Sequence, residues 1–133
     1  MSSQPRIAYL YSRYPVVSQT FCDSEMLELE ERGVDLTIAS INPPMDTFRH
    51  ERFARFKAEV LYPAPPIVLK AEQARLENSG VWEDRLGALI SRHEKDYGPD
   101  FKPATRARNA AWFARVFKER GIQHIHVHFA NRA

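Results

Sequence analysis

The chain has 133 residues, which is enough for one ordinary domain and too few for two. Its residues are 44% hydrophobic and 27% charged, as in a globular protein, and no apolar run approaches the roughly 18 residues that span a bilayer. The formal net charge of +2 and the lack of a recognition motif argue against a nucleic-acid partner.

The cysteine content and the N-terminus indicate a compartment. A single cysteine, Cys22, excludes an internal disulfide and fits a reducing environment. The opening MSSQPR has no apolar segment after its charge, because Arg6 leads straight into a predicted strand. We therefore expect no signal peptide and a cytoplasmic location, with the inner face of the membrane as a place of peripheral contact.

The first 44 residues predict a strand–helix–strand unit. Residues 6–11 (RIAYLY) form a short apolar run that Tyr14-Pro15 ends, and a helix then extends to Gly33. Residues 34–41 (VDLTIASI) form a second strand, which Asn42-Pro43-Pro44 ends. A strand, a helix and a strand within so short a segment favour a right-handed parallel βαβ unit.

The helix of this unit has recognisable signals at both ends. Thr20, followed by Asp23 three residues later, resembles a capping box, and Ser18 is a further candidate cap. Gly33 suits the position after the helix. The face expected to be buried carries Cys22, Met26, Leu27 and Leu29, and the opposite face carries Glu28, Glu30, Glu31 and Arg32.

Later elements are less distinct. We expect a helix from Asp46 or Thr47 through Ala58, a strand over 59–62, and one or two helices over 67–97 with a break near Asn78. Pro103 opens a further helix that Gly121 closes, and residues 124–129 (HIHVHF) form the last strand.

Together these elements predict an α/β fold with a single domain over 1–133. The expected architecture is a Rossmann-like, partial doubly wound parallel sheet of about four strands in the order 3-2-1-4, with helices on both faces. In this order the last strand lies beside the first, and its outer edge has no neighbour. We expect either that the chain is part of a larger protein or that it associates with itself through this edge.

Two segments resemble the N-terminal domain of retaining GT-B glycosyltransferases, of the large family 4 type. The first segment matches at Tyr14-Pro15, Ser18, Thr20-Phe21, Glu25, Leu29 and Gly33. Gln19 stands where the family often has Glu, and Cys22 where it often has Ile. The second, HIHVHFANRA, is similar to the family's strand that ends in a His followed by Phe-Ala.

The resemblance implies a function. The intact enzyme would transfer a sugar from a nucleotide-sugar donor to a saccharide or a lipid-linked acceptor, without a metal or another cofactor. This chain would be the acceptor-side part. The C-terminal domain, which chiefly holds the donor, would be absent, so the chain alone should be inactive. The alternative is a stand-alone α/β binding or assembly module that pairs through its C-terminal edge strand.

Candidate site residues lie where the carboxyl ends of the predicted strands meet. The resemblance implies that His128 is the catalytic residue, because the matching His of the family lies near the sugar and the acceptor, where a neutral imidazole could bond a sugar hydroxyl or help to take the acceptor proton. Without the resemblance, a structural histidine would be the usual explanation. A helix N-terminus and a guanidinium suit a diphosphate. The expected substrate-binding residues are Arg13, Ser18, Gln19, Thr20 and Phe129. Simple helix capping is an equally good explanation for Ser18 and Thr20, and Arg13 is as well explained as a solvated surface residue.

Two further patterns have weaker functional interpretations. His124, His126 and His128 alternate along a strand, but zinc needs more ligands and no Cys or acidic cluster accompanies them, so we predict no metal. The basic, Phe-containing segment 47–60 suits an anionic lipid surface if it is an amphipathic helix. Packing of its Phe residues on the sheet is the simpler explanation.

Overall fold

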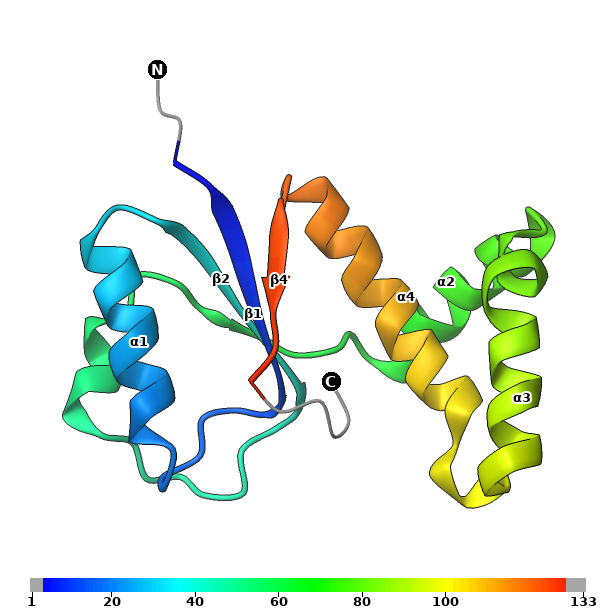
Figure 1. The fold of residues 1–133 in the computed structure, drawn as a ribbon, viewed down its shortest axis with the longest axis horizontal. Coiled ribbons are helices and arrows are strands. Elements are labelled where there is room, and N and C mark those ends of the chain that lie inside the picture. Colours follow the sequence, from blue (N-terminus) through cyan, green and yellow to red (C-terminus); the bar gives the residue numbers. More distant parts are fainter. Residues whose placement is uncertain (1–3, 129–133) are drawn as a thin grey trace. The chain divides into compact units, whose positions relative to one another are not determined.

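The computed structural model describes residues 4–128, which fold into two compact units (Figure 1). Unit 1 comprises Met1–Tyr62 and Phe117–Ala133, of which 4–62 and 117–128 are described, and unit 2 comprises Pro63–Val116. Unit 1 is therefore built from two separate stretches of the chain. This division was not predicted from the sequence.

Unit 1 contains a parallel sheet in the order β3-β2-β1-β4. Its strands are β1 (Arg6–Arg13), β2 (Asp35–Asn42), β3 (Val60–Leu61) and β4 (His124–His126). The α/β class and the strand order 3-2-1-4 are confirmed. Helices connect the strands, as parallel pairing requires.

Register places the last strand against the first. Tyr9 of β1 lies opposite Ile38 of β2 on one side and opposite His126 of β4 on the other. Ile38 in turn lies opposite Val60 of β3. The parallel pairing of β1 with β4 brings the histidine-rich segment next to the N-terminal βαβ unit.

Helix α1 (Thr20–Glu31) lies along one face of this sheet (Figure 1). Its buried apolar side chains are those predicted at Cys22, Met26 and Leu27. They join a core formed by Tyr9, Tyr11, Tyr14, Cys22, Met26, Leu36 and Ile38. Burial of a large apolar side chain of this kind contributes about 1.5–3 kcal/mol, so this core accounts for much of the stability of unit 1.

The predicted capping of α1 is wrong. Gln19 precedes the helix, and no side chain caps its first amides. Asp23 is buried at 3% exposure and accepts a hydrogen bond from the Tyr14 hydroxyl. Glu30, expected on the solvent face, is also buried, and its carboxylate accepts the backbone N–H groups of Lys57 and Ala58 at 3.1 and 3.0 Å. Both acidic side chains are therefore core hydrogen-bond acceptors.

The predicted helix through Ala58 is also wrong. Only a 3-10 turn, η1 (Glu51–Arg55), forms there, and the residues on either side of it are extended. Phe53 and Phe56 pack against the core of unit 1, whereas Phe48 is exposed. This arrangement agrees with the packing explanation of the Phe residues and removes the amphipathic helix on which the lipid interpretation depended.

Unit 2 is helical. It contains α2 (Pro66–Asn78), the π-helical turn η2 (Glu83–Gly87), α3 (Ala88–Tyr97), the 3-10 turn η3 (Pro99–Phe101) and most of α4 (Pro103–Glu119). Glu72 of α2 is buried, and its carboxylate bonds Arg75 and, from α4, Arg115, each at 2.6 Å. Among residues 4–128 no helix is both long enough and apolar enough to cross a bilayer.

Candidate functional site

The candidate site forms where β4 ends beside β1. His126 lies opposite Tyr9 in the parallel register, and the centroids of their rings are 4.8 Å apart. His128 follows two residues later, with its ring centroid 5.9 Å from that of Tyr9. Side chains at alternate positions of an extended segment leave the same face. Both imidazoles consequently project over the face of the sheet that α1 covers.

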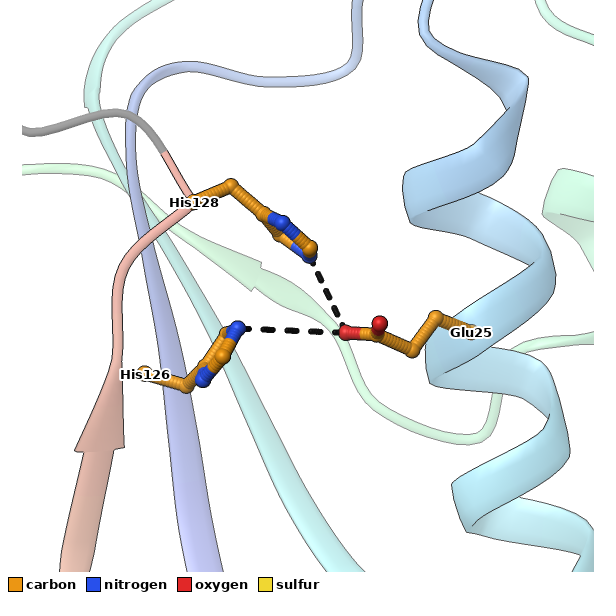
Figure 2. A group of neighbouring side chains, drawn as sticks. All are labelled: Glu25, His126 and His128. Atoms are coloured by element: carbon orange, nitrogen blue, oxygen red, sulfur yellow. Dashed lines mark hydrogen bonds and ion pairs between the residues drawn. The ribbon is translucent and has the colours of Figure 1, made fainter.

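Glu25 of α1 completes a three-residue cluster with these histidines (Figure 2). Nε2 of His128 lies 3.0 Å from Oε2 of Glu25, and Nε2 of His126 lies 4.0 Å from the same oxygen. The Tyr9 hydroxyl donates a hydrogen bond of 2.6 Å to that oxygen as well. Three polar groups, from β1, from β4 and from the residues just after β4, thus converge on one carboxylate of the helix.

Aromatic rings surround His128. Its imidazole stacks on Tyr11 with 6.1 Å between centroids and meets the edge of Phe21 at 5.8 Å. The His128 side chain is 18% exposed, against 41% for His126. Because Phe21 belongs to the first turn of α1, His128 lies beside the end of the turn that precedes this helix. The two segments that carry the family resemblance therefore meet in space.

Electrostatics fix the protonation of two members of the site. The hydrogen bond from Tyr9 is the main reason why the pKa of Glu25 lies below its usual value; desolvation opposes this effect, and the hydrogen bond with His128 lowers the pKa by a smaller amount. Burial, followed by the hydrogen bond to Glu25, raises the pKa of Tyr9. At neutral pH Glu25 is thus a carboxylate and Tyr9 a phenol that donates to it.

The arrangement allows two kinds of chemistry. A carboxylate bonded to an imidazole orients the ring and stabilises it when it takes up a proton, as in carboxylate–histidine pairs that act as general bases. Two imidazoles and a carboxylate are also the donor set that binds zinc and similar ions.

The predicted substrate-binding residues occupy the turn between β1 and α1. Arg13, at the end of β1, donates to the Pro43 carbonyl. Ser18 is exposed, Gln19 is the residue that precedes α1, and Thr20 is its first residue. Phe129 lies outside the described residues. Apart from Phe129, these residues therefore lie at the carboxyl end of β1 or between it and the first residue of α1.

Sequence reasoning did not select Glu25 or Tyr9 as site residues. Glu25 entered only as a match of the family pattern, and Tyr9 only as part of an apolar strand. The signal that could have found Glu25 is its place on α1, one turn after Phe21.

Comparisons with known proteins give no identification: no family model, curated protein or solved structure matches this chain. The function must therefore be inferred from the fold and the site.

Proposed function

We propose that this chain is the acceptor-side part of a retaining GT-B glycosyltransferase. The intact enzyme would transfer a sugar from a nucleotide-sugar donor to a saccharide or a lipid-linked acceptor. Another part of the protein would chiefly hold the donor.

One observation carries the proposal: β4 pairs with β1 in parallel and brings His128 to the first turns of α1. The carboxyl ends of parallel strands are where open α/β sheets bind ligands. The two segments similar to the glycosyltransferase family lie far apart in the sequence, and their juxtaposition at such an edge supports a shared site.

In this proposal His128 receives the proton of the acceptor hydroxyl, or bonds that hydroxyl, and Glu25 stabilises the charged imidazole. Tyr9 holds the carboxylate in place through its 2.6 Å hydrogen bond and is a positioning residue. The turn with Arg13, Ser18, Gln19 and Thr20 would contact the acceptor or its phosphate, because helix N-termini and guanidinium groups favour anions.

The test is titration of the isotope-labelled chain with a panel of saccharides, lipid-linked sugars and nucleotide sugars, followed by NMR and by assays of sugar transfer. We expect an acceptor to shift signals of Glu25 and His128, His128→Ala to abolish that response, and the chain alone to show no turnover. His124→Ala is the matched control on the same strand. Turnover by this chain without a partner, or no response to any acceptor, would refute the proposal.

A second candidate, from a different class, is an assembly module that pairs through β4. This strand is at the edge of the sheet among the described residues, and Ile125 within it is 48% exposed. Light scattering distinguishes the candidates: a discrete dimer that His124→Pro dissociates, with no affinity for sugars or nucleotides, would favour this one.

We also propose that the protein works in the cytoplasm. The basis is Cys22, a free and buried thiol that is the chain's one cysteine and so suits a reducing compartment.

A further inference from the structure

We infer that Glu25, His126 and His128 form a binding site for a divalent transition-metal ion such as Zn²⁺. This inference goes beyond the proposed sugar transfer and does not depend on it, because it concerns only whether three side chains converge as metal ligands. The histidines alone gave no reason to expect a metal. The third ligand, Glu25, belongs to α1, so the spacing of the histidines along the last strand could not reveal it.

The distances suit a metal centre. The donor atoms of the three residues all lie within 4.8 Å of one another, with 3.0 and 4.0 Å from Oε2 of Glu25 to the two Nε2 atoms. Zinc bonds of about 2.0–2.2 Å to nitrogen and oxygen place the ligands of a tetrahedral site roughly 3.3–3.5 Å apart. Small side-chain rotations therefore bring all three atoms into the first coordination sphere.

The donor types select the class of ion. Imidazole nitrogen binds zinc, nickel, cobalt and copper, whereas magnesium and calcium prefer oxygen ligands alone. Three protein ligands would leave a coordination position for water, as in open zinc sites rather than in closed structural ones. The exposure of the His126 and Glu25 side chains, 41% and 44%, gives water and ions access.

A supporting contact is already in place. Ligating carboxylates are usually oriented by a further hydrogen bond. The Tyr9 hydroxyl supplies this bond to Oε2 of Glu25, and an ionised carboxylate has about four lone-pair sites, enough to accept this bond and also to bind the ion. An ion bound here would occupy His128 and would therefore compete with any proton transfer that this imidazole performs.

The experiment is equilibrium dialysis of the untagged, chelator-stripped chain against Zn²⁺, together with cobalt absorption spectroscopy. We expect one equivalent of Zn²⁺ to bind, excess Mg²⁺ not to displace it, and Co²⁺ to give the intense visible bands of a low-coordinate site. Glu25→Ala, His126→Ala and His128→Ala should each weaken binding at least tenfold. Tyr9→Phe should weaken it by about tenfold.

His124→Ala is the matched control, because His124 is on the same strand but outside the cluster, and it should bind as the unmodified chain does. Far-UV circular dichroism checks the fold of each variant, and Glu25→Gln, which keeps the size of the side chain, must also lose affinity.

NMR should show zinc-dependent shifts of the His126 and His128 rings but not of His93. The inference is overturned if no stoichiometric zinc binds, or if His124→Ala weakens binding as much as His126→Ala does. Sugar transfer plays no part in these measurements, so they can fail independently of the proposed function.

Discussion

Glu25 occupies an unusual position for a half-exposed helix residue, since one of its oxygens has three polar neighbours. Tyr9 and His128 lie within hydrogen-bond distance of Oε2, and His126 lies 4.0 Å away. These neighbours come from β1 and from the segment at and after β4, so this carboxylate links α1 to two strands. Its pKa is lowered mainly by Tyr9, which connects the stability of unit 1 to pH.

Tyr9→Phe should make the stability of unit 1 less dependent on pH. A carboxyl whose pKa is lower in the folded state stabilises the fold above its unfolded pKa, and that contribution disappears as the pH falls through the folded value. The variant lacks the Tyr9 hydroxyl, whose hydrogen bond is the largest cause of the lowered pKa of Glu25. Its deficit in unfolding free energy should therefore be greatest near neutral pH and shrink in acid, as measured by denaturant titration at several pH values.

Glu28→Gln is the control for this measurement, because Glu28 is an exposed residue of the same helix that pairs with Arg32 across one turn. Its effect should be small at every pH. A deficit of Tyr9→Phe that stays constant across the acid range would contradict the assigned role of Tyr9.

Tyr14→Phe should destabilise unit 1 by about 1–3 kcal/mol, the usual cost of leaving a buried polar group without its partner. The Tyr14 hydroxyl donates to Asp23, and both side chains are buried. Thermal or chemical unfolding measures the loss. Tyr97→Phe, at a tyrosine that is 66% exposed, should leave stability nearly unchanged. Equal effects of the two changes would exclude the buried hydrogen bond as the cause.

At the scale of elements, the side chain of Glu30 connects α1 to the residues just before β3. Glu30 accepts both the Lys57 and the Ala58 backbone N–H groups, and these amides directly precede the short strand Val60–Leu61. Two backbone donors would otherwise lack partners at the point where the chain enters the sheet.

Glu30→Ala should therefore loosen the edge of the sheet at β3. We expect a loss of about 1–3 kcal/mol in stability and faster hydrogen exchange of the amides of residues 57 and 58. Glu31→Ala, at the exposed neighbouring position, is the control and should change neither. Unchanged hydrogen exchange of the amides of residues 57 and 58 in Glu30→Ala would show that the Glu30 carboxylate does not protect them.

The elements that the sequence predicted well are those bounded by strong local signals. Tyr14-Pro15, Gly33 and Pro43-Pro44 separate β1, α1 and β2, and the apolar face of α1 follows helical spacing. The segment before β3 was mispredicted as a helix because its spacing of Phe residues also suits one. Contacts of Phe53 and Phe56 with the core, and the bonds to Glu30, favour an extended path instead.

The candidate site was predictable only in part. His128 could be selected because it lies near the end of the predicted strand 124–129 and matches a family pattern. Its partner Glu25 is 103 residues away in the sequence, and no local periodicity connects the two. Only the parallel pairing of β1 with β4 brings them together, and side-chain partners across such a pairing follow from exact register rather than from element order.

At the scale of the whole molecule, the two units are stabilised by different interactions. Unit 1 depends on an apolar core that includes Ile38, which is fully buried. In unit 2, the buried Glu72 bonds arginines of α2 and α4, and these bonds lower its pKa, with Arg75 as the largest cause. Local unfolding should therefore respond differently to changes in each unit.

Ile38→Val should remove about 0.5–1.5 kcal/mol and reduce hydrogen-exchange protection mainly in β1 and β2. Glu72→Gln should reduce protection mainly in α2 and α4, because a buried hydrogen-bonded charge is lost there. Exchange measured residue by residue on both variants tests this. Identical exchange patterns in the two variants would mean that the chain opens as one cooperative body.

The discontinuous make-up of unit 1 has a consequence for biosynthesis. A ribosome produces β1, α1, β2 and β3 early, then the whole of unit 2, and only afterwards β4. Until that last strand emerges, one flank of β1 is open and Glu25 has neither imidazole beside it. A nascent chain thus acquires its histidine–carboxylate cluster as a final step, and prematurely terminated products would lack it however well their earlier portions fold.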